Sequence, residues 1–283
     1  MMDDIIILLI ICMVAGLIGS LVGLGGGLII TPILTTFFDI DIKYAIGASI
    51  LAVIATSSGA SISFLKDKLT NVRIGLFLEI FTTLGALIGA LLAGIFSSQI
   101  LYLLFSFILM NSFYGMLKKE GIIKNKSSKR SLYTKDLYAE KLGFSSSYYD
   151  KSEKKEISYE VYNVKQGSLV MLGAGLASGL LGIGSGAFKI MALDGYMKLP
   201  IKVSTATSNF MMGVTASTSA LIYFLNGTIN PYIAAPVALG TLFGSMIGSR
   251  LMQILNAKYL RYIMLPIILF TIINMIMKGF GLI

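Results

Sequence analysis

Two clusters of glycine are the first residues that could carry chemistry. They are Gly23-Leu-Gly-Gly-Gly27 and Gly182-Ile-Gly-Ser-Gly186. Glycine allows a sharp bend, and a helix that starts after such a bend has unpaired backbone N–H groups at the positive end of its dipole. Such groups bind small anions, although glycines also serve simply to pack membrane helices closely. The predicted anion contacts are Gly25, Gly26, Gly27, Gly184, Ser185 and Gly186.

Polar side chains that follow these clusters are the next candidates. Ser49 and Ser208 lie at corresponding distances after the two clusters, and Asn209 follows Ser208 directly. Hydroxyl and amide donors can replace the water around an anion without a permanent charge that would hold it too long. Serine can also bond to its own helix. We expect Ser49, Ser208 and Asn209 to contact the same anion.

Two ionisable residues lie inside apolar segments. Lys189 comes three residues after Gly186, and an ionisable group at that depth is a functional candidate. It could attract an anion or pair with Asp194. Glu79 could extend its carboxylate to the membrane surface, which is the favoured interpretation, or it could couple transport to protons or another ion.

The elements that must position these residues occur twice. When the chain is shifted along itself by 159 residues, the two clusters coincide, and so do several other residues over about a hundred positions. The coinciding pairs include Gly16 and Gly175, Lys43 and Lys202, Ser49 and Ser208, Asn71 and Asn230, Gly85 and Gly244, and Gly89 and Gly248. A register kept without gaps predicts one unit built twice, with a binding site between the halves.

The composition indicates a protein of the lipid bilayer. Hydrophobic residues make up 55% of the 283 positions, and the mean hydropathy is +0.83. The chain has one cysteine, Cys12, and no histidine. Disulfide frameworks, Cys/His zinc sites and Ser-His catalysis are therefore excluded, and we expect no cofactor, no metal and no enzymatic activity.

Hydrophobic segments predict an all-α, polytopic membrane protein. Each half begins with a glycine-broken or re-entrant helix, within residues 5–38 and 167–197. Three spanning helices follow in each half, each with about 20 apolar residues. They are 44–65, 74–96, 100–117, 203–225, 232–255 and 260–277.

Positive charge predicts orientation in the plasma membrane. The polar segment 118–166 holds twelve Lys or Arg and seven Asp or Glu residues, so it should be cytoplasmic, and nucleic acid is not needed to explain the net charge of +9. This divides the chain into a first membrane repeat (1–117), a cytoplasmic linker (118–166) and a second membrane repeat (167–283). The basic ends of the second repeat also face the cytoplasm if the repeats are inverted, which we favour over parallel halves. These ends are Lys198, Lys202, Lys258 and Arg261.

The linker itself allows two interpretations. Its Lys, Ser and Tyr residues are typical of a simple connector, which is the favoured interpretation. Its aromatic residues give enough apolar surface for a small ordered patch, and a regulatory or lipid-binding role is the alternative. These residues are Tyr138, Phe144, Tyr148, Tyr149, Tyr159 and Tyr162.

At these motifs the chain resembles the TauE/SafE sulfite exporter family. The resemblance rests on Ala15 to Pro32 with the first glycine cluster, on the weaker copy Ala174 to Gly186, on Ala45-Ile-Gly-Ala-Ser49, and on the glycine pairs 85/89 and 244/248. It implies transport of small sulfur-containing anions such as sulfite, thiosulfate or organosulfonates. Ser185 in place of a glycine, Met191 in place of a proline, and the added Lys189 depart from the first motif.

Together these features predict a secondary transporter of small anions that works by alternating access. The anion would lie between the two glycine bends. An anion channel is one alternative, and a membrane scaffold that acts through its cytoplasmic loop is another; the duplicated site without rings of charge disfavours the channel.

Overall fold

Helices make up most of the protein. The computed structural model describes residues 2–119, 136–182, 184–255 and 257–282. The elements are α1 (Met2–Val22), α2 (Gly27–Phe37), α3 (Ile42–Lys66), α4 (Val72–Ala93), α5 (Ser98–Lys119), α6 (Leu137–Lys141), β1 (Ser146–Asp150), β2 (Lys155–Tyr159), α7 (Val164–Leu181), α8 (Gly186–Ile190), η1 (Met191–Tyr196), α9 (Ile201–Leu225), α10 (Pro231–Ile254) and α11 (Ala257–Gly279).

The element boundaries recur at the same offset as the sequence. Helices α1 and α7 end 159 residues apart, α2 and α8 begin 159 apart, and α3 and α9 share both bounds at this offset. Asn71 and Asn230 cap α4 and α10 at corresponding positions, where each side chain accepts a hydrogen bond from a backbone N–H of the first turn. The segment 186–196 is continuous and has the length of α2, although its second part has π-helical geometry.

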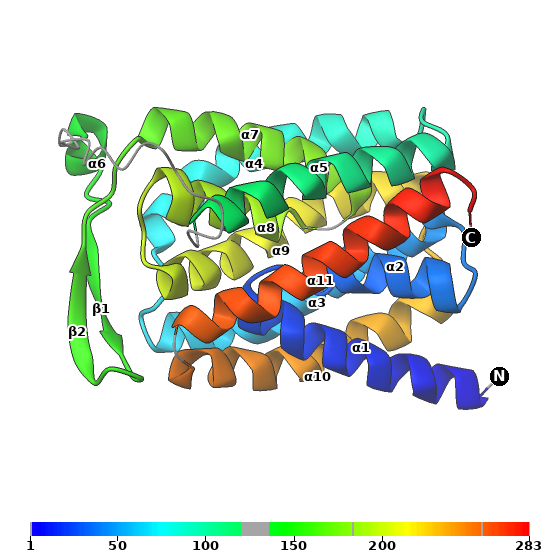
Figure 1. Cartoon of the computed structure of the whole chain (residues 1–283), viewed down its shortest axis with the longest axis horizontal. Helices are drawn as coiled ribbons and strands as arrows, with labels where there is room; N and C mark the ends of the chain where they lie inside the picture. Colours follow the sequence, from blue (N-terminus) through cyan, green and yellow to red (C-terminus); the bar gives the residue numbers. More distant parts are fainter. Residues whose placement is uncertain (1, 120–135, 183, 256, 283) are drawn as a thin grey trace.

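Each half contains a hairpin of helices followed by three crossings of the bundle. Figure 1 shows α1 running inward from the end that carries both termini, and α2 returning to that end. Helix α7 starts instead at the end that carries α6, β1 and β2, and η1 returns there. We call this the linker end and the other the opposite end. Asn163 Nδ2 donates to Tyr196 O at the linker end, which fixes the two ends of the second hairpin together.

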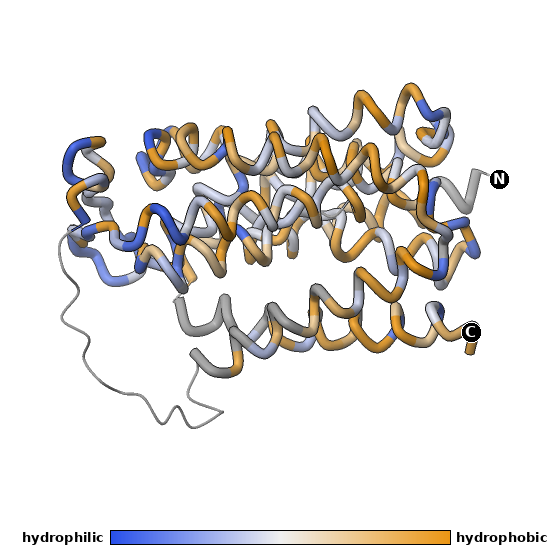
Figure 2. Tube along the Cα trace, turned by 90° about the horizontal axis from the view of Figure 1, so that it is seen from above, coloured by the Kyte–Doolittle hydropathy of each residue, from blue (hydrophilic) through white to orange (hydrophobic). Residues whose placement is uncertain are grey.

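The outer surface is apolar. On α4, Leu76, Ile80 and Leu91 are at least half exposed, whereas Leu78, Gly85 and Gly89 are buried. Figure 2 shows hydrophobic residues along the helices, with hydrophilic residues gathered toward their ends. Helices α3, α4, α7 and α10 are long and apolar enough to cross a membrane, among the residues that the structure describes. A hydrophobic exterior of this kind fits a lipid environment.

Small residues allow the first helix of each half to pack closely against a helix of the other half, α1 against α10 and α7 against α4. A Cβ added at Gly85 of α4 would lie 2.2 Å from Leu172 O of α7, and one added at Gly244 would meet Met13 O of α1. Gly16 and Gly175 contact the backbones of Thr241 and Thr82 in the same way. These glycines therefore let the helices of the two halves pack with their backbones in close contact.

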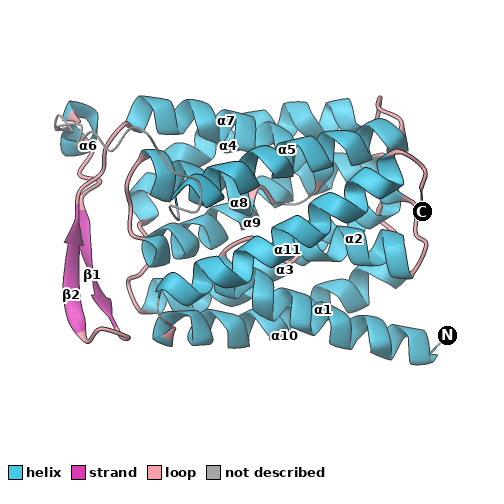
Figure 3. Cartoon of the chain, in the orientation of Figure 1, coloured by secondary structure: helices cyan, strands magenta, loops and turns pink. Residues whose placement is uncertain are grey.

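The segment between the halves corrects the expectation of an all-α chain. Strands β1 and β2 pair antiparallel, with Ser146 opposite Tyr159 and Asp150 opposite Lys155, and they lie across the linker end (Figure 3). Asp136 accepts hydrogen bonds from Tyr138 N and Val164 N, and so joins α6 to α7. The alternation within such short, polar strands is weak, which is why their pairing was missed. Residues 120–135 of the segment 118–166 lie outside the described residues, as do the side chains of Lys258 and Arg261.

Candidate functional site

The two glycine clusters form the bends between α1 and α2 and between α7 and α8. Gly23 and Gly25 have φ angles of 76° and 70°, and Gly184 has 72°. These left-handed values favour glycine. Ser185 has a φ of 53°, so a non-glycine residue adopts this geometry at the second bend. The clusters therefore bend the chain, as predicted.

The two bends lie against each other. A Cβ added at Gly27 would come within 2.9 Å of Gly182 O, and one added at Gly186 within 2.4 Å of Gly23 O. These contacts are reciprocal, because Gly27 corresponds to Gly186 and Gly23 to Gly182 in the sequence repeat. The start of each returning helix thus packs on the other bend.

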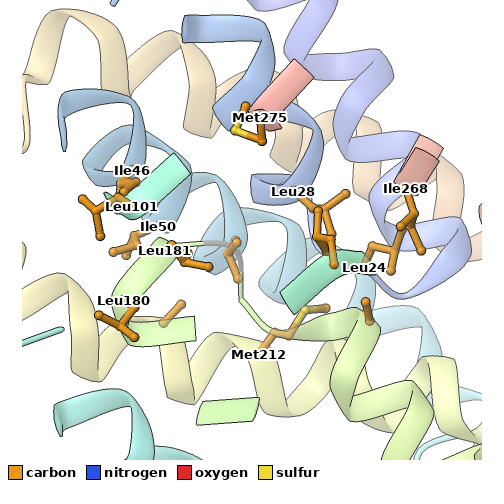
Figure 4. Packing of buried hydrophobic residues seen from close by; sticks show 14 of the residues in the cluster. Leu24, Leu28, Ile46, Ile50, Leu101, Leu180, Leu181, Met212, Ile268 and Met275 are labelled. Atoms are coloured by element: carbon orange, nitrogen blue, oxygen red, sulfur yellow. The ribbon is translucent and has the colours of Figure 1, made fainter. Parts of the chain in front are cut away.

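Hydrophobic side chains close the space around the bends. Side chains of Val53 on α3 and Met212 on α9, which correspond in the repeat, lie where Cβ atoms at Gly25 or Gly184 would be. Leu24 is fully buried, and Figure 4 shows it in one cluster with Met212 and Leu181. The described side chains therefore pack closely around both bends.

The predicted serine and asparagine contacts surround the same place. Ser208 Oγ lies 3.2 Å from Gly23 O and 3.4 Å from Gly186 O, and so contacts both bends. Ser49 Oγ accepts a hydrogen bond of 2.8 Å from Thr31 Oγ1 of α2. Asn209 Nδ2 donates to Ser20 O of α1, while Asn209 Oδ1 is buried without a hydrogen-bond partner in the structure.

A further buried hydroxyl, that of Thr56 on α3, lies next to the first bend. Thr56 Oγ1 has no hydrogen-bond partner in the structure and would lie 3.0 Å from a Cβ at Gly26. The hydrogen bonds of α2 begin with Ile29 and Ile30, whose N–H groups donate to Gly26 O. The preceding amides of Gly27 and Leu28 are therefore at the position where a helix lacks partners of its own. The sequence already places Thr56 among the hydroxyl residues that follow the first glycine cluster, and its counterpart in the repeat is Thr215.

Lys189 and Glu79 form an ion pair in the interior. Lys189 Nζ lies 3.4 Å from Glu79 Oε2, and their side chains are 0% and 7% exposed. Thr215 links them, since its hydroxyl accepts from Lys189 and donates to Glu79. The favoured interpretation that Glu79 reaches the membrane surface is wrong, because α4 directs it toward α8 and α9. The described partner of Lys189 is Glu79 and not Asp194.

This ion pair makes the two bends chemically different. The residue that corresponds to Lys189 in the repeat is Ile30 of the first half, and the residue that corresponds to Glu79 is Ala238 of the second half; both are uncharged. Thr215 is bound by the ion pair, whereas its counterpart Thr56 has no partner. The first bend thus retains a hydrogen-bond donor for a ligand, while the second bend is next to a neutralised pair of charges.

Comparisons with known proteins agree with the hydrophobic helices and the paired bends. The profile of the family described as Sulfite exporter TauE/SafE matches residues 8–275. The chain belongs to the TauE/SafE sulfite exporter family. Its relatives are named probable membrane transporter proteins, which indicates a membrane transporter and not an enzyme.

Three relatives of this TauE/SafE protein cover almost its whole length. YunE of Bacillus subtilis is 27% identical over 97% of this chain and 98% of its own. A probable membrane transporter protein of Methanocaldococcus jannaschii is 28% identical over 93% and 91%. YdhB of Bacillus subtilis is 23% identical over 90% and 93%. No solved structure matches the chain.

Proposed function

We propose that this protein is a secondary transporter of small anions, with sulfite, thiosulfate or an organosulfonate as substrate. The observation that carries the proposal is the first bend, where the amides at the start of α2 and the unpartnered hydroxyl of Thr56 lie together. These are neutral donors, and the helix dipole adds a positive field. Gly25, Gly26 and Gly27 would contact the anion from the first half, together with Ser49. Gly184, Ser185, Gly186, Ser208 and Asn209 would contact it from the second half.

The two halves would be inverted repeats that move against each other. The reciprocal contacts of the bends and the hairpins that start at different ends of the bundle support this proposal. Because Val53 and Met212 close the centre, binding and release need alternating access from the two ends. The linker end, near Lys66 and Arg73, would face the cytoplasm, and the membrane would be the plasma membrane.

Glu79 and Lys189 would couple the anion to a proton. When Glu79 takes up a proton, its charge no longer neutralises Lys189, and the ammonium of Lys189 can attract the anion. The two species then cross together. The contact through Thr215 keeps both groups in position for this exchange.

The site is tested by flux of labelled small anions into vesicles that contain the purified protein. Thr56→Val keeps the shape of the side chain and removes the hydroxyl, so we expect a higher KM for the transported anion. Thr36→Val is the matched control, because Thr36 Oγ1 is also buried without a partner but lies near the end of α2, away from the bend. Equal KM values for the two variants, or no saturable anion flux by the wild type, would contradict the proposal.

Charge at the first bend provides a second comparison. Gly26→Asp places a carboxylate beside the proposed anion and should abolish flux, whereas Gly26→Asn has nearly the same shape without the charge. Residual flux in the asparagine variant alone would support electrostatic repulsion. An equal loss of flux in both variants would show that the volume of the added side chain, and not its charge, prevents transport.

Coupling is tested by the double variant Glu79→Ala with Lys189→Ile, which replaces each residue of the pair by its uncharged counterpart in the repeat. We expect its flux to lose the response to an imposed proton gradient. A response as large as that of the wild type would exclude this pair as the coupling site.

A further inference from the structure

Each end of the bundle has a small vestibule, and the two are built from corresponding residues. The vestibule at the opposite end is lined by Lys43, Gly94, Asn226 and Thr228. Adding or subtracting 159 gives Lys202, Gln253, Asp67 and Leu69, and all four line a cavity at the linker end. The repeat therefore produces a pair of vestibules, one at each end, and each contains a lysine from the first turn of a long helix.

The vestibule at the opposite end is open. Its volume is about 410 Å³, and Lys43 is the one residue with a full charge at neutral pH among the described residues that line it. Two residues that line this vestibule also contact the second bend or the end of α7 before it. Ile46, which lines it, would contact a Cβ at Gly182, and Tyr223 donates its hydroxyl hydrogen to Gly179 O or Leu180 O at the end of α7. An anion that meets Lys43 is thus near the path to the bends.

The vestibule at the linker end is filled by the β-hairpin. Only about 10 Å³ remains, and the added lining residues are Tyr149, Asp150 and Lys151 of the hairpin. Lys202 is 2% exposed, and its Nζ lies 2.8 Å from Asp150 Oδ1. Lys202 also donates to Gln253 O and Ser152 Oγ. A carboxylate of the chain itself therefore occupies the position next to Lys202.

Other contacts hold the hairpin over this vestibule. Lys151 forms an ion pair of 3.0 Å with Asp67 and donates to Gln253 Oε1, so the hairpin is attached to both halves. Asn71 Nδ2 donates to Phe144 O and to Tyr159 Oη, which attaches the hairpin to the start of α4. These contacts explain why the second vestibule is closed although its walls correspond to those of the first.

We propose that Lys43 and Lys202 are matched sites where a small anion is first bound at the two ends, and that the β-hairpin blocks the second site with Asp150 in the place of the anion. The proposal rests on the proposed function, because it concerns access to the same central bends. The carboxylate of Asp150 and the anion would compete for Lys202. An anion therefore reaches or leaves the centre at the linker end only when Asp150 separates from Lys202. The ligand class is an oxyanion or sulfonate small enough for the open vestibule.

Thiol labelling tests this without measuring transport. Cys12→Ser removes the single cysteine, and Thr228→Cys or Leu69→Cys then places a thiol at corresponding positions in the open and the closed vestibule. In detergent solution, a charged maleimide should label position 228 faster than position 69. Asp150→Asn should raise the rate at position 69 by about tenfold, since hydrogen bonds to charged groups contribute about 1.5–3 kcal/mol. It should leave position 228 unchanged.

Two controls test whether the changes in labelling rate come from the Asp150–Lys202 contact and from anion binding at Lys43. Glu156→Gln changes a hairpin carboxylate that bonds to Ser147 and not to Lys202, so it should not alter labelling at position 69. Methanesulfonate should slow labelling at position 228, and Lys43→Gln should remove this protection. The proposal is overturned if Asp150→Asn acts like Glu156→Gln, or if methanesulfonate protects equally without Lys43. Failure of anion flux in the wild type would refute the transporter proposal while these labelling results could still hold.

Discussion

At the scale of single residues, the interior of this TauE/SafE protein contains one described ion pair next to the second bend. Charges inside a low-dielectric region are costly, and Lys189 and Glu79 remain there because each neutralises the other and Thr215 joins both. The uncharged counterparts Ile30 and Ala238 show that the helix packing does not require this pair. Its presence beside one bend only is consistent with a functional role.

Removing one partner of this pair should destabilise the protein more than removing both. Glu79→Gln leaves the Lys189 ammonium buried without a countercharge, and we expect a loss of about 3–5 kcal/mol in the free energy of unfolding. The double variant Glu79→Ala with Lys189→Ile should recover most of this loss, because it leaves no buried charge. Thermal unfolding in detergent measures both variants, and a double variant as unstable as the single one would contradict this account.

At the scale of elements, close contact between the two hairpins depends on glycine. Gly186 lies against Gly23 and the backbone of Leu24, so even one methyl group has no room there. Backbone atoms cannot move aside as a flexible side chain can. The hairpins therefore meet backbone to backbone at this junction, and their bends set where the returning helices begin.

Gly186→Ala should lower stability by about 1–3 kcal/mol or more, because the added methyl group overpacks the junction. Gly173→Ala on the neighbouring helix α7 is the matched control, since an added Cβ there meets nothing within 4 Å. In a helix that change should raise stability by up to about 1 kcal/mol. Melting temperatures of the two variants should therefore move in opposite directions; a shift of the same sign would refute the junction.

Attachment of the β-hairpin should also depend on pH. Burial alone would raise the pKa of Asp150, but hydrogen bonds from Lys202 and Ser152 outweigh it and lower the pKa from 3.8 to about 2. Ionised Asp150 thus stabilises the attached hairpin above about pH 4, and this contribution is lost as the pH falls toward 2. Labelling of Leu69→Cys, normalised to Thr228→Cys, should be constant between about pH 5 and pH 8 and rise below about pH 4. A rise near neutral pH would show that another group controls the hairpin.

At the scale of the whole molecule, the two ends are defined by the linker. Arg73 Nη1 donates to Gly143 O, and Lys202 binds Asp150, so basic residues of both halves lie at the linker end. Asn226 lies beside Gly94 at the opposite end. Basic residues from both halves at the linker end support the proposal that this end faces the cytoplasm.

Sidedness in cells should follow this arrangement. In the Cys12→Ser background, an impermeant thiol reagent outside the cell should label Asn226→Cys, whereas Ser145→Cys should react only after the membrane is permeabilised. Both positions are exposed, so access through the membrane alone separates them. External labelling of Ser145→Cys would contradict a cytoplasmic linker.

Periodicity and composition were sufficient to predict much of the fold. The hydrophobic segments, the two bends and the offset of 159 residues are local or repeated patterns, and the helices begin and end close to the expected positions. Ser49, Ser208 and the glycine clusters stood out as candidates because the same residue types recur 159 positions apart.

Contacts between distant segments could not be read in the same way. Nothing in the spacing of Lys189 and Glu79, 110 residues apart, indicates that they meet, and Asp150 and Lys202 belong to segments of different character. The sequence alone thus determined the hydrophobic helices and their bends, because these follow from local hydrophobicity and glycine geometry. The pairing of buried charges and the closing of one vestibule arose only in the folded chain, because both depend on which surfaces the packed helices bring face to face.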